Sequence, residues 1–236
     1  MKPKIDLYSF PDHECLINEL THEITEILKS GVEQNRRASL AVSGGRTPGV
    51  LFEALSLTDI PWQNVDITLV DERWVDPTDS DSNEHLVRSH LLQNNAAAAH
   101  FTGMKNLAAT AGEGESECEK QLKKISRPFD VLILGMGNDG HTASLFPGAE
   151  KLPQATDMNS GKTCMAIAPL TAPHERMTLT LPAILESRKI FLHITGQGKK
   201  DVLDKALADG AAADMPIRFI LRRTGHKLPV SVFWAK

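Results

Sequence analysis

Residues 129–137 read Phe-Asp-Val-Leu-Ile-Leu-Gly-Met-Gly, and the predicted fold follows from this stretch. Its first six residues form the most apolar of the expected strands, which the two glycines close. Other short apolar runs have the same layout and end in glycines or charged residues. They lie at Ser39–Val42 and Asp66–Val70. Strands that alternate with helical segments predict an α/β fold with a largely parallel sheet and helices on both faces.

The remaining elements follow from hydrophobic periodicity. Further strands are expected at Ile5–Phe10, Met165–Ala168, Lys189–Ile194 and Val230–Trp234. A long helix is expected to open at Pro11-Asp12, to bury an apolar face and to end at Gly31. Later helices are expected from Thr47-Pro48 onward and at Asn83–Leu92, Gly114–Ile125 and Lys199–Leu207.

The composition is that of a folded globular protein, with 236 residues, 41% of them apolar, and a net charge of −4. No stretch resembles an interdomain linker, so we expect residues 1–236 to form a single domain.

Because basic residues are not in excess over acidic residues, we do not expect nucleic acid to be the main partner. No apolar run approaches the roughly 18 residues that span a membrane. Three widely spaced cysteines without a CxxC pair favour a reducing, cytoplasmic setting.

Four polar groups of residues stand where expected strands end. They are Ser43–Thr47, Asp71–Arg73, Gly135–His141 and Lys199. Ligands of open parallel sheets bind beyond the carboxyl ends of the strands. We therefore expect these segments to gather at one edge of the sheet and to form the functional site.

The first of these groups has the properties of an anion site. Gly44 and Gly45 allow backbone amides to turn inward, and the N-terminus of the following helix adds partial positive charge. Ser43, Arg46 and Thr47 supply hydroxyl and guanidinium donors. The GxxxxGK[ST] pattern of a Walker loop is missing, so the segment predicts a site for a phosphate or another small anion. A plain strand-to-helix turn is the alternative.

Residues 135–141 contain the pattern GxGxxG, but they do not predict a dinucleotide site. Pro147 cuts the following segment short, and no acidic residue closes a second strand about 20 residues on. Asp139 and His141 flank a glycine, so the backbone can bring both side chains to a ligand. An imidazole can take a proton from water near neutral pH, and a carboxylate can orient it. The loop therefore indicates a general base, with a histidine that caps the loop as the alternative.

The other charged residues have two interpretations each. Asp71-Glu72-Arg73 is either a solvated turn or a set of catalytic groups at the sheet edge. Arg176 and Lys199 are either solvated cations or charges that bind a phosphate.

Taken together, these segments resemble the 6-phosphogluconolactonase family. The most specific match is GMGNDGHTASLFPG at Gly135–Gly148. Shorter matches lie at Ser43–Pro48, Asp71–Val75, Ser82–Glu84, Arg176–Thr180 and Gly196–Lys199. The resemblance runs from about Ser39 to Lys199 and, more loosely, to the end of the chain.

The resemblance implies a Rossmann-like α/β fold and the hydrolysis of 6-phospho-D-glucono-1,5-lactone to 6-phospho-D-gluconate, the second step of the oxidative pentose phosphate pathway. It implies a carboxylic ester hydrolase that uses no metal or organic cofactor and whose partner is a small phosphosugar lactone. On this basis we expect His141 to activate water, Asp139 to orient His141, and Arg73 to stabilise the oxyanion or anchor the sugar hydroxyls. The phosphate is expected at Ser43, Gly44, Gly45, Arg46 and Thr47, with charge added by Arg176 and Lys199.

Two alternatives stay open. The related glucosamine-6-phosphate deaminase/isomerase family shares the fold and the Asp-Gly-His core, but it carries a catalytic glutamate where this chain has Phe146, which favours the lactonase. Asp71 matches the position of that family's proton-abstracting aspartate, and we include it among the candidate catalytic residues. A sugar-phosphate sensor without catalysis is the other alternative, and the presence of Asp139 together with His141 argues against it.

Overall fold

The computed structural model describes residues 5–45, 47–170, 172–222 and 230–236. Its strands are β1 (Ile5–Phe10), β2 (Ala38–Val42), β3 (Val65–Leu69), β4 (Asp71–Arg73), β5 (His100–Thr102), β6 (Phe129–Leu134), β7 (Cys164–Ile167), β8 (Arg176–Leu179), β9 (Ser187–Thr195) and β10 (Val230–Ala235). Its helices are α1 (His13–Asn35), α2 (Gly49–Ser56), α3 (Asn83–His90), α4 (Ala111–Leu122), α5 (Leu152–Ala155), α6 (Leu181–Leu185), α7 (Gln197–Leu207) and α8 (Ile217–Leu221). Short 3₁₀ helices cover Trp62–Asn64, Asn94–Ala98 and Ala212–Asp214.

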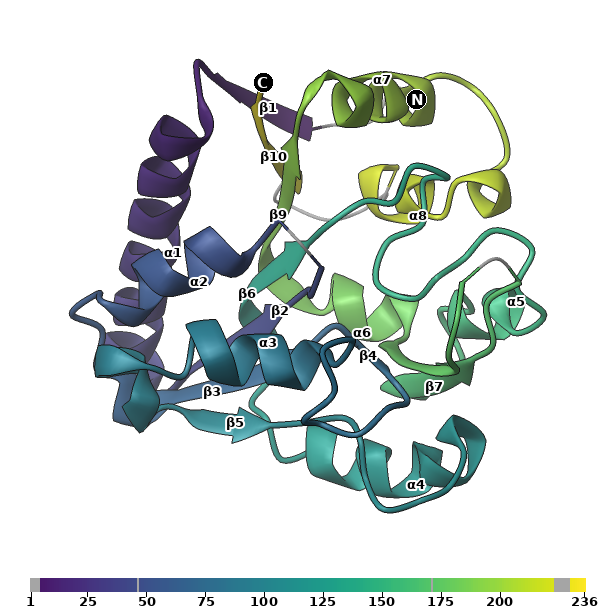
Figure 1. The fold of residues 1–236 in the computed structure, drawn as a ribbon, viewed down its shortest axis with the longest axis horizontal. Coiled ribbons are helices and arrows are strands. Elements are labelled where there is room, and N and C mark those ends of the chain that lie inside the picture. Colours follow the sequence, from purple (N-terminus) through teal and green to yellow (C-terminus); the bar gives the residue numbers. More distant parts are fainter. Residues whose placement is uncertain (1–4, 46, 171, 223–229) are drawn as a thin grey trace.

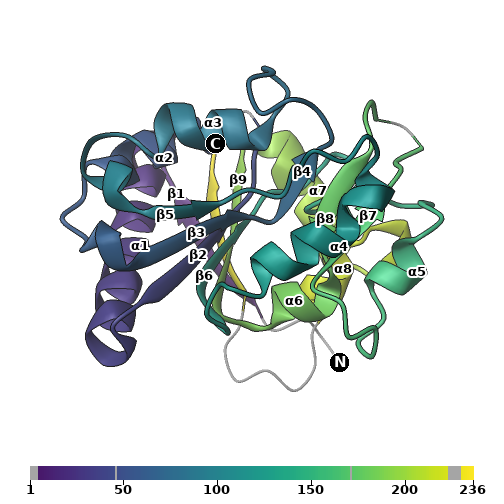
Figure 2. The same ribbon diagram turned by 90° about the horizontal axis from the view of Figure 1, so that it is seen from below.

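A seven-stranded sheet with the order β1-β10-β9-β6-β2-β3-β5 forms the centre of the fold. Each strand is parallel to its neighbours. Figure 1 shows the sheet, and Figure 2 shows α1 and α2 on one side of it and α6, α7 and α8 on the other. The predicted α/β architecture, with a parallel sheet and helices on both faces, is thus confirmed.

The central strands β6 and β2 are buried along their whole length, as expected for a parallel sheet that helices cover on both faces. Asp130, the one acidic residue of β6, has its carboxylate paired by residues of the neighbouring strands. Its Oδ2 accepts the Ser39 backbone N–H at 2.9 Å, and its Oδ1 lies 3.2 Å from Nε of Arg188. This pairing explains how a carboxylate is accommodated in the most apolar strand.

Helix α1 begins as predicted but does not end at Gly31. The side chain of Asp12 accepts the Cys15 backbone N–H at 2.8 Å and caps the first turn. The helix continues to Asn35 and stops at Arg36, whose φ is 63°. A Cβ at Gly31 would lie 3.1 Å from Cβ of Ala38. Glycine therefore allows the helix to approach the sheet closely at this point, and the prediction that it ends the helix was wrong.

The chain passes from the large sheet into a second, antiparallel sheet with the order β4-β8-β7. Val70 joins the two, because its N–H donates to the Val42 carbonyl at 2.9 Å and its carbonyl accepts the Leu179 N–H at 2.8 Å. Residues Asp71–Arg73, for which a solvated turn was one interpretation, form strand β4. The small sheet therefore begins at the carboxyl end of β3, where the polar groups were expected to gather.

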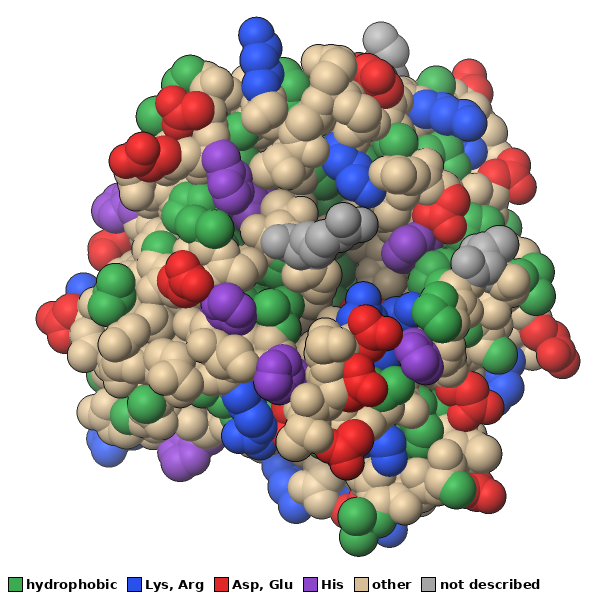
Figure 3. Space-filling view, in the orientation of Figure 1, with side chains coloured by type: hydrophobic (Ala, Val, Ile, Leu, Met, Phe, Trp, Pro, Cys, Tyr) green, Lys and Arg blue, Asp and Glu red, His purple; other side chains and the backbone are tan. Residues whose placement is uncertain are grey.

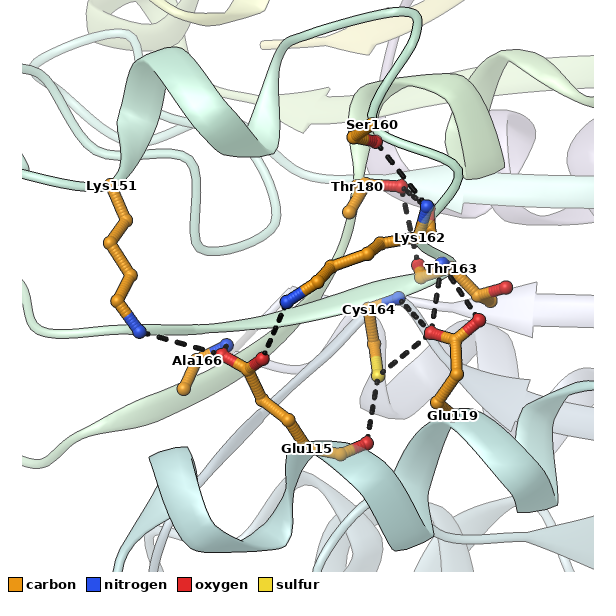
Figure 4. Close-up of polar contacts among 9 residues, drawn as sticks. All are labelled: Glu115, Glu119, Lys151, Ser160, Lys162, Thr163, Cys164, Ala166 and Thr180. Carbon is orange, nitrogen blue, oxygen red and sulfur yellow. Dashed lines mark hydrogen bonds and ion pairs between the residues drawn. The ribbon is translucent and has the colours of Figure 1, made fainter.

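Side chains of helix α4 hydrogen-bond to β7, one of the two outer strands of the small sheet. Figure 4 shows the carboxylates of Glu115 and Glu119 directed from α4 toward the chain at β7. Glu119 accepts the backbone N–H groups of Thr163 and Cys164 at 2.9 and 3.1 Å, and Glu115 accepts that of Ala166 at 2.9 Å. These bonds satisfy donors on an edge strand and fix the sheet whose middle strand, β8, carries Arg176.

Candidate active site

A cavity of about 500 Å³ lies at the carboxyl ends of β2, β6 and β9, with residues of β4 and β8 in its wall. Figure 3 shows a hollow in the middle of one face, with Lys, Arg and His side chains around it. Most of the predicted site residues line it: Ser43, Gly44, Gly45, Thr47, Asp71, Arg73, His141, Arg176 and Lys199. Asp139 reaches the site through its contact with His141, and Arg46 lies outside the described residues. The structure thus brings the four polar groups together at one sheet edge.

The glycine loop after β2 is tied to the end of β6 by Ser43. The Ser43 hydroxyl donates to the Ile133 carbonyl at 2.9 Å and accepts the Gly135 N–H at 3.2 Å. The Ser43 side chain therefore joins two strand ends in addition to lining the cavity. Gly45 has a φ of 98°, in the left-handed region that favours glycine.

Asn83, the first residue of α3, locks this loop to β4. A Cβ added at Gly44 would overlap the Asn83 side-chain amide, and Nδ2 of Asn83 donates to the Asp71 carbonyl at 2.8 Å. Asn83 also lines the cavity. The sequence placed Asn83 within a family-like segment, Ser82–Glu84, but gave it no role.

His141 and Asp139 form a carboxylate–imidazole pair. Nδ1 of His141 lies 2.6 Å from Oδ1 of Asp139, which also accepts the His141 backbone N–H at 3.0 Å. Burial of Asp139 disfavours its charge, but the hydrogen bonds and the attraction from His141 outweigh burial and hold the pKa of this carboxyl below its ordinary value. In the neutral imidazole, an ionised Asp139 favours the tautomer with the proton on Nδ1, which leaves the lone pair on Nε2. This is the state that a general base needs.

The ring of Phe146 supports the imidazole. The two ring centroids are 4.2 Å apart, at an interplanar angle of 31°. The guanidinium carbon of Arg176 lies 5.7 Å from the centroid of the same ring. Phe146 stands where the deaminase-like alternative requires a catalytic glutamate, and here it packs between two polar residues of the cavity.

Arg73 and Arg176 are directly opposite each other across β4 and β8, so their side chains share one face of the small sheet. Nε of each is buried without a hydrogen-bond partner in the described part of the chain. Arg73 donates to the Asp81 carbonyl, and Nη2 of Arg176 donates to the Pro173 carbonyl at 3.3 Å. Burial lowers the pKa of Arg176, and nearby Asp71 opposes this shift. Two adjacent guanidiniums with unused donors suit an anion or an electron-rich oxygen.

Asp71 and Glu72 have different surroundings. Asp71 lines the cavity, is buried, and accepts the Ser144 hydroxyl at 2.6 Å. Glu72 is fully buried and accepts the backbone N–H groups of Arg73, Asn83 and Glu84 at 2.7, 2.7 and 2.8 Å. Burial raises the pKa of Glu72, and these bonds oppose the rise. Glu72 is thus neither solvated nor in the cavity lining; it holds the N-terminus of α3.

Lys199, in the first turn of α7, reaches the loop after β6. Its Nζ donates to the Met136 carbonyl and to Oδ1 of Asn138, both at 2.7 Å. Burial lowers the pKa of Lys199, while the charge of Asp139 opposes this shift. Lys199 therefore holds the loop that carries His141 in place, and it also lines the cavity.

Among the residues that the structure describes, no group of three or more His, Cys, Asp or Glu side chains is arranged to hold a metal ion. None of the helices in those ranges combines the length and apolarity needed to cross a membrane. Cys15, Cys118 and Cys164 carry free thiols.

The fold and the cavity are those of an α/β enzyme with a site for a small molecule at the carboxyl edge of its sheet. A family model described as glucosamine-6-phosphate isomerases/6-phosphogluconolactonase matches residues 11–230. The chain belongs to this family, and its predicted resemblance to the 6-phosphogluconolactonases is confirmed, as is the prediction of an enzyme of that type.

Individual relatives agree over nearly the whole chain. A 6-phosphogluconolactonase of Neisseria meningitidis serogroup A is 42% identical over 219 residues, covering 92% of this chain and 93% of the relative. One of Rhizobium meliloti is 37% identical over 230 residues, covering 98% of each. The crystal structure of a 6-phosphogluconolactonase from Shewanella baltica OS155 matches with a TM-score of 0.96 at 45% identity, covering 100% of both chains.

Proposed function

We propose that this chain hydrolyses 6-phospho-D-glucono-1,5-lactone to 6-phospho-D-gluconate, with His141 as the general base. The observation that carries the proposal is the His141–Asp139 pair, which stands at a cavity that also holds two adjacent guanidiniums. Lactone hydrolysis needs a base for water and positive charge for the carbonyl oxygen, and this cavity offers both.

In the proposed reaction, Nε2 of His141 takes a proton from water as the water oxygen bonds to the lactone carbonyl carbon. Asp139 stabilises the imidazolium, and Arg73 stabilises the oxyanion. When the oxyanion collapses, the bond from the carbonyl carbon to the ring oxygen breaks. The imidazolium returns its proton to that oxygen, and the new carboxylic acid ionises. General-base help of this kind contributes about 10²–10⁴-fold, and a preorganised cation contributes a few kcal/mol more.

The phosphate is proposed to bind Gly44, Gly45 and Thr47, with charge added by Lys199 and Arg176. Because Arg176 and Arg73 are cross-strand neighbours, one small molecule can contact both. Binding energy at the phosphate then holds the carbonyl near His141. Asp71 is proposed to keep Ser144 and the neighbouring loop in place through its 2.6 Å hydrogen bond.

We also propose that the protein acts in the cytoplasm as a single domain, with the phosphosugar lactone, and not nucleic acid or membrane, as its partner. The net charge of −4 argues against nucleic acid as the partner.

The test is an assay of lactone hydrolysis, corrected for the spontaneous rate, with the wild type and His141→Ala. We expect His141→Ala to lower kcat at least about 100-fold while KM changes little. His100→Ala, at an exposed position on β5, is the matched control and should behave as wild type. Wild-type turnover in His141→Ala would remove this residue from the mechanism. Release of ammonia from glucosamine 6-phosphate, without lactone hydrolysis, would overturn the proposed function.

A further inference from the structure

The ammonium group of Lys199 is held by two neutral oxygens of the loop that carries His141. Its Nζ donates to the Met136 carbonyl and to Oδ1 of Asn138, each at 2.7 Å. Neither acceptor is charged, so these bonds direct the ammonium group without neutralising it. An ammonium group has three N–H donors, and within the described ranges two of them have these partners. Because Lys199 and Asn138 both line the cavity, the third donor suits an anionic group bound there.

Asn138 lies in a tight turn that also positions the imidazole of His141. The Gly137 N–H donates to the His141 carbonyl at 2.8 Å, and the Gly140 N–H donates to the Gly137 carbonyl at 3.1 Å. A Cβ added at Gly137 would lie 2.1 Å from Nδ1 of His141, so the imidazole packs directly on the turn. The turn therefore ties Asn138 and the proposed general base together as one unit.

The carboxylate in the same turn is used for another contact. Oδ1 of Asp139 lies 2.6 Å from Nδ1 of His141. Burial lowers the pKa of Lys199, and the charge of Asp139 opposes this shift. Asp139 thus acts on Lys199 through its charge, whereas the hydrogen bonds that aim the ammonium group come from uncharged oxygens. A carboxylate in the place of the Asn138 amide would pair with the ammonium group and offset its charge.

We propose that Asn138 is a positioning residue that aims the Lys199 ammonium group at the phosphate of the substrate and thereby makes the enzyme selective for a phosphorylated lactone. This inference rests on the proposed function, because it assigns the third donor of Lys199 to the phosphate. The turn that carries the base also holds the cation, so it relates the place of the phosphate to the place of the reacting carbonyl. Asn138 acts through Lys199 and takes no part in the chemistry at the carbonyl.

The test compares kcat/KM for 6-phospho-D-glucono-1,5-lactone and for the unphosphorylated D-glucono-1,5-lactone, with the wild type and Asn138→Ala. Without the amide oxygen, the long stem of Lys199 is free to turn away from the phosphate. We expect kcat/KM for the phosphorylated lactone to fall about five- to tenfold, while the value for the unphosphorylated lactone changes less than about twofold. Damage to the turn or to His141 would lower both values together, so the ratio isolates the phosphate contact.

Competitive inhibition by inorganic phosphate gives a second readout, which decides even where the unphosphorylated lactone is hydrolysed no faster than it is spontaneously. The inhibition constant should rise about five- to tenfold in Asn138→Ala and further in the nearly isosteric Asn138→Asp, whose carboxylate offsets the charge of Lys199. In a Lys199→Ala background, Asn138→Ala should have little further effect, because its role depends on the lysine. Asn159→Ala, at an exposed position outside the cavity lining, is the matched control and should behave as wild type.

Equal losses on both lactones, or an unchanged inhibition constant for phosphate in Asn138→Ala, overturn this inference and leave the lactonase intact. Tighter inhibition by phosphate in that variant also overturns it, because Asn138 would then compete with the phosphate for Lys199. If Asn138→Ala does not fold, an unchanged inhibition constant in Asn138→Asp has the same meaning. A wild type that hydrolyses neither lactone overturns the proposed function itself, so the two failures are distinguishable.

Discussion

The side-chain amide of Asn83 occupies the space that a Cβ on Gly44 would need, and it is held there by its 2.8 Å hydrogen bond to the Asp71 carbonyl. The loop after β2, strand β4 and the start of α3 therefore interlock at one point. The shape of the proposed phosphate loop depends on a side chain that lies well beyond it in the sequence.

This interlock predicts that Gly44→Ala damages the site. The new methyl group must displace either the loop or Asn83, so we expect kcat/KM for the lactone to fall at least about tenfold, a change of about 1.4 kcal/mol. Gly198→Ala is the matched control, because it lies in α7 with nothing within 4 Å of an added Cβ. The control should keep its activity. Equal activity of both variants would show that the interlock does not shape the site.

Replacing Asp139 by Asn should reduce kcat more than it changes KM. The substitution removes the negative charge that stabilises a protonated His141 and lets the amide present N–H to Nδ1. We expect kcat to fall about tenfold to a hundredfold, less than for removal of the imidazole itself. Steady-state kinetics at pH 7 measures the effect, and a variant with unchanged kcat would limit Asp139 to holding the loop.

Arg176→Ala should chiefly raise KM, because its charge is assigned to the phosphate. We expect KM to rise at least about tenfold, together with weaker competitive inhibition by inorganic phosphate. Arg188→Ala removes an arginine that pairs with Asp130 outside the active-site cavity and should leave both constants as in the wild type. If Arg176→Ala lowered kcat at constant KM, Arg176 would act on the reacting carbonyl instead.

Glu72→Gln should destabilise the protein although it is nearly isosteric. Oε1 of Glu72 accepts the N–H groups of Arg73 and Asn83, and Oε2 accepts the Glu84 N–H and the Ser82 hydroxyl. In the glutamine variant, the side-chain NH₂ group takes the place of one of these oxygens and faces N–H or O–H donors instead of acceptors. We therefore expect the free energy of unfolding to fall by about 1–3 kcal/mol. Urea denaturation measures it. Unchanged stability would mean that the carboxylate is already protonated in the folded protein.

His193 should make the protein sensitive to mild acid. Burial, with a smaller effect of the neighbouring His13, lowers the pKa of His193 from an ordinary 6.5 to about 4 in the folded protein. As the pH falls from 6.5 toward 4, the unfolded chain therefore binds a proton there that the folded protein does not. The stability is complete above pH 6.5, and about 3 kcal/mol is lost on the way to pH 4. Urea denaturation of His193→Phe across this range should lack this loss, and parallel curves for the two proteins would contradict the prediction.

Features encoded by neighbouring residues were predictable from the sequence. The apolar run of β6 and the glycines after β2 carry their own local signals, and strand ends of a parallel sheet share an edge. Strand β4 was not predicted, because three charged residues become a strand only by pairing with β8, far along the chain. His193, which lies in the cavity wall, was not singled out because it stands inside an apolar run that periodicity assigns to the core. A polar residue between Phe191 and the glycine at 196 was the available signal.

The edge strand β1 is paired in parallel with β10, so Ile5–Phe10 bind Val230–Ala235. The two strands that pair at this edge of the sheet thus lie far apart in the sequence. Helix α1, which follows β1, packs on β10 as well as on β2 and β6. We expect the nascent polypeptide to leave part of the apolar face of α1 exposed until β10 has been synthesised, and deletion of β10 to give a product that aggregates.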